Sequence, residues 1–200
     1  MSIGVPKVPF RRFEREKSRW IDLYQRLYYD KIVFLTREIT GIIVNQIIAL
    51  LLYLGKDNDD ISLYINSPGG GALASLGIYD TIKSLVPNVR TIGMGLAASG
   101  ASLILVGGTK SKRIAFPHTR VLIHQPSASR FVGTPRSIEL EAEEMFKLRD
   151  VIADIYSENT GRPVNEIQND MERDTYMSAT EAQDYGIVDR IIKEKQKKIK

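Results

Sequence analysis

The chain has 200 residues, of which 43% are hydrophobic and 26% charged, as is typical of one soluble globular domain. It contains no Cys, which excludes disulfides and thiolate metal sites and fits a reducing compartment. The net charge is +4, but residues 193–200 carry five Lys against one Glu, so the remainder is close to neutral. This balance argues against a nucleic-acid-binding surface, and we interpret the tail as a solvated end.

The N-terminal segment, residues 1–20, is predicted to be an arm outside the core, because Pro6 and Pro9 interrupt it and it carries several basic residues. It has no long apolar core and no small-residue cleavage site, and it is a poor amphipathic transit peptide. The longest apolar stretch, residues 42–54, is too short and too polar to span a bilayer. We therefore expect a soluble protein.

After residue 30, apolar runs of strand length alternate with apolar patterns of helical spacing, which predicts an α/β protein. The expected strands are residues 32–35, 61–65, 89–94, 121–123 and 187–189. The expected helices are residues 42–54, a segment ending near 85, a long helix beginning at 135, and a short helix opened by the capping box at 178–181. In the long helix Met145, Leu148, Ile152 and Ile155 form a narrow apolar seam, and Gly161 and Pro163 end it.

The first sharp break between a strand and a helix is glycine-rich, with PGGG at residues 68–71. Such a run leaves backbone N–H groups free to face a phosphate or a developing oxyanion, and it is equally consistent with a tight turn. The sequence contains neither the G-x-x-x-x-G-K-[ST] nor the G-x-G-x-x-G pattern, so nucleotide binding is disfavoured.

The second break carries Ser99 among small residues, GMGLAASGA at 93–101. Because the chain has no Cys, a Ser or Thr must supply any hydroxyl or thiol nucleophile, and only His118 and His124 could act as its imidazole base. His124 follows an apolar strand, where scaffold-held catalytic side chains are found, whereas His118 is expected to be structural or exposed in a loop. The residues alone leave open that Ser99 and His124 are ordinary packing residues, since Ser99 does not lie in G-x-S-x-G.

An acid that orients the histidine is harder to choose, because six aspartates lie downstream of His124. They are Asp150, Asp154, Asp170, Asp174, Asp184 and Asp189. Asp174 precedes a short strand-like stretch just before the capping box, where a carboxylate could face inward. Spacing alone does not select it.

Together these segments resemble the proteolytic subunits of the Clp protease family, the ATP-dependent caseinolytic serine peptidases. The matching segments are YINSPGG at 64–70, IYDTI at 78–82, GMGLAAS at 93–99, IHQP at 123–126, ERD at 172–174, MSATEA at 177–182 and YGIVD at 185–189. They follow the family's order over nearly the whole chain after residue 30. Residues 3–11 resemble the plastid-encoded type of subunit.

The resemblance implies a triad in which Ser99 is the nucleophile, His124 the general base and Asp174 the acid that orients the histidine. It also implies that the backbone N–H groups of Gly70 and Gly100 form the oxyanion hole. No cofactor and no metal are implied for this subunit, since a partner chaperone uses the ATP.

The implied architecture is α/β and crotonase/ClpP-like, with repeated ββα units and a protruding handle helix at about residues 137–160. Residues 21–200 would form one peptidase domain, and residues 1–20 an axial arm at the pore. The implied particle is a tetradecamer, two stacked heptamers of homologous and mixed Clp subunits, docked by an AAA+ Clp chaperone. Unfolded proteins would be its substrates in the plastid (chloroplast) stroma, with no nucleic acid or membrane as partner.

Two departures from the family pattern bear on activity. The residue after the nucleophile is commonly Met followed by Gly, but here Gly100 is followed by Ala101, and residues 71–75 are unusually small. A Gly loosens the backbone that supplies the oxyanion N–H, by up to about 1 kcal/mol relative to Ala. A catalytically weak or structural ring subunit is therefore an alternative, and a crotonase-type enzyme acting on acyl-CoA is another, although it leaves the triad unexplained.

Overall fold

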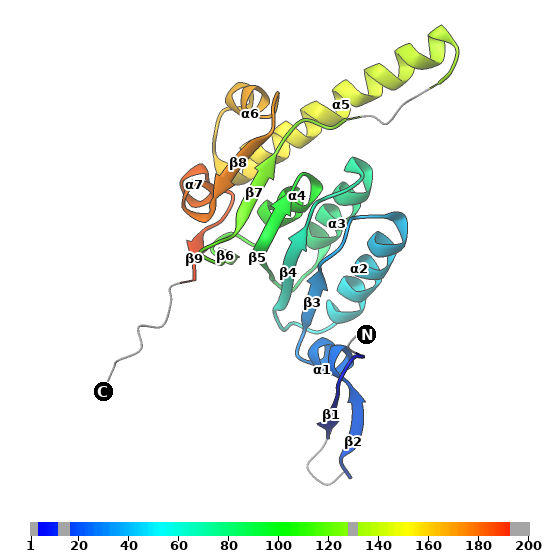
Figure 1. The fold of residues 1–200 in the computed structure, drawn as a ribbon, viewed down its shortest axis with the longest axis vertical. Coiled ribbons are helices and arrows are strands. Elements are labelled where there is room, and N and C mark those ends of the chain that lie inside the picture. Colours follow the sequence, from blue (N-terminus) through cyan, green and yellow to red (C-terminus); the bar gives the residue numbers. More distant parts are fainter. Residues whose placement is uncertain (1–3, 12–16, 128–131, 193–200) are drawn as a thin grey trace.

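In the computed structural model, which describes residues 4–11, 17–127 and 132–192, a seven-stranded sheet forms the centre of the molecule (Figure 1). Its strands are β3 (Ile32–Leu35), β4 (Ile61–Ser67), β5 (Val89–Ala98), β6 (Arg113–Ala115), β7 (Arg120–Ile123), β8 (Thr175–Ser178) and β9 (Arg190–Ile191). Paired strands are parallel except for β7 and β8, which are antiparallel. A largely parallel sheet with helical crossovers confirms the predicted α/β class.

Strand β5 organises the sheet, because it is long enough to have three neighbours. Strand β4 pairs along one edge, whereas on the other edge β6 pairs with residues 91–93 and β7 with residues 96–98. The carboxyl ends of β4, β5 and β7 therefore meet at one edge of the sheet. In open α/β sheets ligands bind outside the carboxyl ends of the strands.

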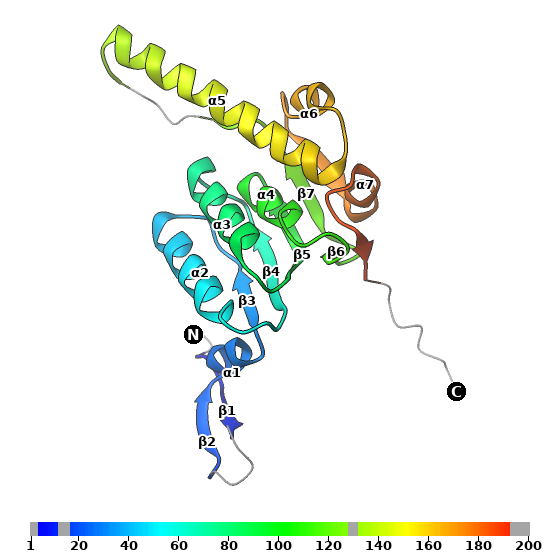
Figure 2. The ribbon, with the colours of Figure 1, turned by 180° about the vertical axis from the view of Figure 1, so that it is seen from behind.

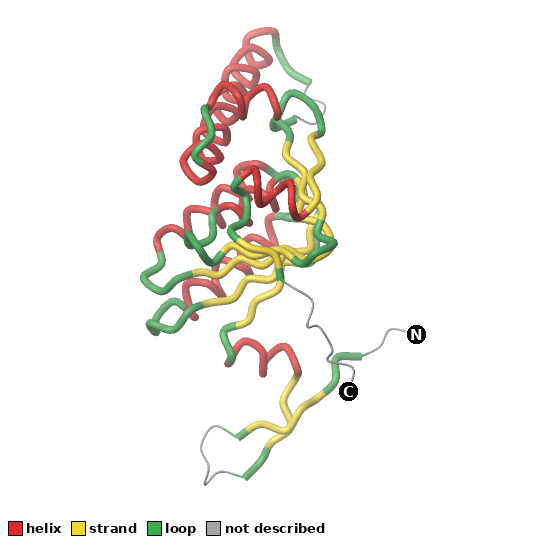
Figure 3. Tube along the Cα trace, turned by 90° about the vertical axis from the view of Figure 1, so that its left-hand side faces the viewer, coloured by secondary structure: helices red, strands yellow, loops and turns green. Residues whose placement is uncertain are grey.

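Three helices cover one face of the sheet, as the rear view in Figure 2 and the side view in Figure 3 show. They are α2 (Gly41–Leu54), α3 (Ala72–Ser84) and α4 (Gly100–Val106). Every residue of α4 after Gly100 is buried, and this short helix packs against both α3 and the long helix that follows later in the chain. The start of α4 is thus fixed by its surroundings on several sides.

The long helix α5 (Pro135–Thr160) projects beyond the sheet (Figures 1 and 2). The hydroxyl of Thr134 accepts the N–H of Ser137, Pro135 occupies the first turn, and Gly161 ends the helix in the left-handed region at φ 81°. Both predicted ends are confirmed. Its buried residues all lie in the last third of the helix, whereas Phe146 is largely exposed.

The C-terminal elements are α6 (Val164–Asp170), β8, α7 (Ala179–Tyr185) and β9. The predicted capping box is confirmed, since Ser178 and Glu181 exchange hydrogen bonds at the start of α7. The prediction of a strand at residues 187–189 is wrong, because the last strand, β9, begins after these residues. The N–H groups of Ile187 and Val188 both donate to Ala182 O, so these buried apolar residues close α7 instead of joining the sheet.

At the N-terminus, β1 (Lys7–Phe10) and β2 (Arg19–Asp22) form an antiparallel pair of their own, followed by α1 (Leu23–Tyr29). This pair lies away from the seven-stranded sheet (Figure 1). The division into an axial arm (1–20) and a peptidase domain (21–200) stays a prediction, and the tail at 193–200 lies outside the described residues. No helix in the described part of the chain has the length and apolar character needed to cross a membrane.

Candidate active site

Ser99 lies between the end of β5 and the start of α4, in a backbone conformation that serine rarely adopts. Its φ is 55° and its ψ is −126°, so it is one of the non-glycine residues with positive φ. Such a conformation costs on the order of 1–3 kcal/mol and persists only where the surroundings impose it. Here the N–H of Ser99 donates to Leu122 O at 2.9 Å, which ties the turn to β7.

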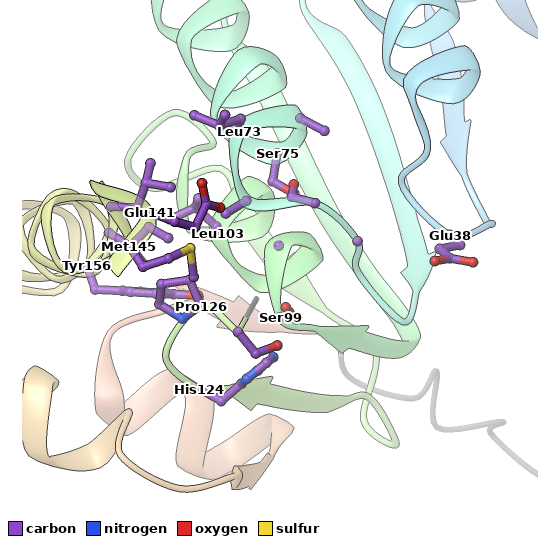
Figure 4. A pocket seen from close by; sticks show the side chains of 18 residues that line it. Glu38, Leu73, Ser75, Ser99, Leu103, His124, Pro126, Glu141, Met145 and Tyr156 are labelled. Atoms are coloured by element: carbon purple, nitrogen blue, oxygen red, sulfur yellow. The ribbon is translucent and has the colours of Figure 1, made fainter. Parts of the chain in front are cut away.

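His124 reaches the same place because of the register of two parallel strands. Ala98 pairs with Leu122, so Ser99 follows one strand end and His124 follows the other. Figure 4 shows the two side chains pointing toward one another, and both line one cavity of about 740 Å³. Within the described residues no hydrogen bond joins the Ser99 hydroxyl to the imidazole. His118 is exposed, as expected.

Asp174 lies at the neighbouring strand end. Ile123 pairs with Thr175 in the antiparallel β7–β8 ladder, so the register continued by one residue sets His124 opposite Asp174. The carboxylate is exposed and does not line the cavity, which differs from the expectation that it faces inward. No hydrogen bond joins it to His124 within the described ranges.

Three of the other candidate acids are engaged elsewhere. The carboxylate of Asp150 accepts from Gln168, that of Asp170 accepts from Tyr185, and that of Asp189 forms an ion pair with Arg113. The position of Asp174 at the strand end next to His124 therefore favours it over these three. Its assignment as the orienting acid stays a prediction.

The glycine run after β4 folds directly against Ser99. Gly69 has φ 93°, and a Cβ there would lie 2.5 Å from Ala98 O and 2.8 Å from the Cβ of Ser99. Only glycine allows this approach. Gly69 O accepts the N–H of Ile39 at 2.8 Å, and because the peptide is planar and trans, this bond also fixes the direction of the Gly70 N–H.

Gly100 is packed equally closely, against Ser75. A Cβ on Gly100 would lie 1.9 Å from Ser75 Oγ and 3.6 Å from Gly70 O, so the two glycines predicted to form the oxyanion hole lie near each other. Neither the Gly70 nor the Gly100 N–H donates to a group in the described part of the chain. Both donors are therefore available to a bound oxygen.

The cavity continues from Ser99 between α3, α4 and α5. Helix α5 contributes three apolar residues to the cavity lining, Met145, Leu148 and Ile152, together with Tyr156 and Glu141. Three of these belong to the seam predicted from helical spacing. Helical spacing alone did not indicate that the seam lines the same cavity as Ser99, or that the buried Tyr156 lines it too.

Hydrophobic lining with a few convergent polar groups is typical of a site that binds a chain or a small molecule. No group of three or more His, Cys, Asp or Glu side chains in the described ranges is arranged to hold a metal ion. The geometry instead joins a hydroxyl, an imidazole and two backbone N–H groups. This combination fits acyl transfer through a covalent intermediate.

Comparison with known proteins gives a consistent result. The family model described as Clp protease matches residues 14–195. The chain is 53% identical over 193 residues to the chloroplastic ATP-dependent Clp protease proteolytic subunit 1 of Arabidopsis thaliana, covering 96% of this chain and 98% of that protein. It is 52% identical to the ATP-dependent Clp protease proteolytic subunit of Arabis hirsuta, with the same coverage. The corresponding subunit of Adiantum capillus-veneris is 49% identical, covering 96% of each chain.

Proposed function

The chain belongs to the Clp protease family, a family of peptidases, and from this premise we propose that it is a serine endopeptidase subunit of an ATP-dependent Clp protease. One observation carries the proposal. Ser99 is held at positive φ beside two glycine N–H groups, with His124 aimed at its hydroxyl (Figure 4). A packing serine would not need this conformation, whereas a nucleophile that must be accessible from a strand end benefits from it.

The reaction follows from the roles of these groups. Nε2 or Nδ1 of His124 takes the proton of Ser99 as Oγ attacks the peptide carbonyl carbon. The negative charge that develops on the carbonyl oxygen is stabilised by the N–H groups of Gly70 and Gly100. The C–N bond then breaks, the imidazolium gives its proton to the leaving amine, and an acyl-enzyme remains on Ser99. Water, activated by the same histidine, hydrolyses the ester.

Asp174 would orient His124 and stabilise the imidazolium. The strand register supports this role, because it sets the two residues opposite each other at the end of β7 and the start of β8. The carboxylate needs only to turn inward from its exposed position. We expect this to happen in the assembled particle, where contacts between ring subunits would position the carboxylate.

The wider role follows from the family and from the relatives' names. The chain would assemble with homologous Clp subunits in two stacked heptameric rings, with an AAA+ Clp chaperone that uses the ATP. Unfolded proteins would be cut to short peptides inside the chamber. The Arabidopsis thaliana relative is named as chloroplastic, which supports a plastid location, and we propose the stroma as the compartment.

The second candidate function is a catalytically weak or structural ring subunit. The exposed Asp174 carboxylate favours it, since no hydrogen bond orients His124 within the described residues. Gly100 adds to it, because a glycine holds the oxyanion N–H less firmly than another residue would. The two functions predict opposite results for a single substitution at Ser99.

A fluorophosphonate probe applied to the assembled particle tests the proposal. We expect labelling of this chain at Ser99, identified by peptide mass spectrometry, and loss of labelling in Ser99→Ala. Ser84→Ala is the matched control, because Ser84 is an exposed serine at the end of α3 whose hydroxyl donates to Thr81 O. Unchanged peptide hydrolysis in the Ser99→Ala particle, with no labelling of the native chain, would establish the structural role instead.

A further inference from the structure

The peptide between Ser99 and Gly100 carries two functions at once. Its nitrogen is the Gly100 N–H, a proposed oxyanion donor, and its oxygen is Ser99 O. Because a peptide is planar and trans, the direction of the C=O fixes the direction of the N–H. Any group that holds Ser99 O in place therefore aims the Gly100 N–H.

Ser102 is such a group. Its hydroxyl donates to Ser99 O at 2.7 Å, in addition to the backbone N–H of Ser102, which donates to the same oxygen at 2.9 Å. Ser102 is fully buried, so water does not compete for this bond. The backbone N–H of Leu103 also donates to Ser99 O, at 3.3 Å, so the Ser102 side chain adds the shortest of three hydrogen bonds to this carbonyl.

Tyr156 completes the arrangement from α5. Its hydroxyl lies 2.6 Å from Ser102 Oγ, and the Ser102 proton is already used on Ser99 O, so Tyr156 must be the donor in this contact. Burial raises the pKa of Tyr156 well above its usual value, which keeps the hydroxyl protonated at any working pH. The proton order is therefore fixed: Tyr156 donates to Ser102, and Ser102 donates to Ser99 O.

The opposite oxyanion donor is held in the same manner by a backbone group. Gly69 O accepts the Ile39 N–H at 2.8 Å, and this bond fixes the Gly69–Gly70 peptide. Both proposed donors thus belong to peptides whose carbonyl oxygens accept hydrogen bonds from other residues. On the Gly100 side, side chains supply part of the anchor, and side chains can be changed without altering the strand pairing.

We infer that Ser102 and Tyr156 are positioning residues, which hold the Ser99–Gly100 peptide so that the Gly100 N–H points at the oxyanion of the transition state. The inference rests on the proposed peptidase function of Ser99. It explains how a chain with glycine after the nucleophile keeps an ordered oxyanion hole. It also means that the C-terminal part of α5 contacts, through Tyr156 and Ser102, the peptide that follows the nucleophile.

Three variants of the assembled particle test this role: Tyr156→Phe, Ser102→Ala and the double variant. Tyr185→Phe is the matched control, because it removes another buried tyrosine hydroxyl, which bonds to Asp170 and makes no contact with the Ser99–Gly100 peptide. The readouts are kcat and KM for a short peptide ester, the rate of fluorophosphonate labelling of this chain at saturating probe, and Tm. Labelling reports on this chain alone even if other subunits in the ring are active.

We expect kcat and the saturating labelling rate to fall about three- to tenfold in each single variant, since each loses one buried hydrogen bond. The KM and the probe's half-saturating concentration should stay within about twofold, because substrate binding does not use this peptide before charge develops. The double variant should lose less than the product of the two single losses, since both act on the same peptide. The fall in kcat should stay smaller than the roughly hundredfold fall that is expected when an oxyanion donor is removed completely.

Several results would overturn the inference. If Tyr156→Phe and Ser102→Ala lower Tm as Tyr185→Phe does but keep the native kcat and labelling rate, the two residues are structural only. If KM rises and kcat is unchanged, they shape substrate binding instead. If Ser99 of the native particle is neither labelled nor needed for hydrolysis, the proposed function is wrong and the inference fails with it. This result differs from the case in which the native particle is active and the variants are unaffected, which contradicts the inference alone.

Discussion

Ser75 Oγ lies where the side chain of any residue larger than glycine at position 100 would have to begin. A Cβ built on Gly100 would be 1.9 Å from this oxygen and 2.7 Å from Ser75 Cβ. Ser75 is itself fully buried, and its hydroxyl donates to Gly71 O at 3.0 Å. The small residues at 71–75 and the glycine after the nucleophile are therefore one packing arrangement, not two separate departures from the family pattern.

Gly100→Ala is expected to lower the free energy of unfolding by roughly 1–3 kcal/mol, the usual cost of forcing an extra carbon into a packed site. Urea denaturation monitored by circular dichroism measures this. The double variant Ser75→Gly/Gly100→Ala supplies the control, because it removes the two Ser75 atoms that would lie within 2.7 Å of the new Cβ. The free energy of unfolding of the double variant should be higher than the sum of the two single losses predicts, because the new Cβ then has room. Purely additive losses would show that the two positions do not share the space.

Gly69→Ala should be more damaging, because two effects add. The left-handed φ of 93° costs an alanine about 1–2 kcal/mol, and its Cβ would lie 2.5 Å from Ala98 O. Relief of that contact must move the backbone next to Ser99, so we expect labelling of Ser99 by a fluorophosphonate to fall at least about tenfold. Gly41→Ala is the control, since a Cβ there meets nothing within 4 Å. Native labelling in Gly69→Ala would contradict the close approach described here.

The positions of Ser99 and His124 at the ends of strands could be predicted from the sequence, whereas their catalytic roles stay a prediction. Ser99 and His124 each follow a buried apolar strand, and parallel strands bring their carboxyl ends together. The contact between Ser102 and Tyr156 could not be predicted, because it joins residues 54 apart through the packing of α4 on α5. The sequence shows at Ser102 only a hydroxyl residue in an apolar run, three positions after the candidate nucleophile.

The errors in the predicted fold have local causes. Strand β5 is longer than the predicted 89–94, because the small residues up to Ala98 still pair with β7. Strand β6 went unnoticed because it has only three residues. Residues 187–189 have a strand-like apolar pattern, but they fold back to cap α7, and no pattern of single residues distinguishes these two uses of Ile and Val.

The ion pair between Arg113 and Asp189 should make stability depend on pH in the acid range. Burial alone would raise the pKa of Asp189, but hydrogen bonds from the Arg113 side chain and backbone outweigh it and hold the pKa below its usual 3.8. A lowered pKa in the folded state stabilises the fold above pH 3.8, and this contribution is lost as the pH falls through the folded-state value. Asp189→Asn should cost roughly 1.5–3 kcal/mol at pH 7.

Urea denaturation from pH 7 to pH 2 compares the native chain with Asp189→Asn, and the difference between them should shrink on acidification. Asp184→Asn, at an exposed aspartate on α7, should follow the native curve throughout. A difference that is the same at pH 2 and pH 7 would mean that the Asp189 charge does not contribute.

Asp174 gives the most direct separation of an active subunit from a structural one. If it orients His124 in the assembled particle, Asp174→Asn leaves the shape of the site but favours the wrong imidazole tautomer, and kcat should fall about 10⁴-fold. The control is Asp154→Asn, because Asp154 is another exposed aspartate downstream of His124, on α5. The measurement is the Ser99-dependent rate, taken as the rate of the native particle minus that of Ser99→Ala. In the structure of the active particle a carboxylate oxygen of Asp174 should lie within about 2.6–3.2 Å of an imidazole nitrogen, so that the carboxylate has turned inward from the exposed position seen in the single chain. A native rate in Asp174→Asn, together with a carboxylate still facing solvent, would show that His124 works without this acid.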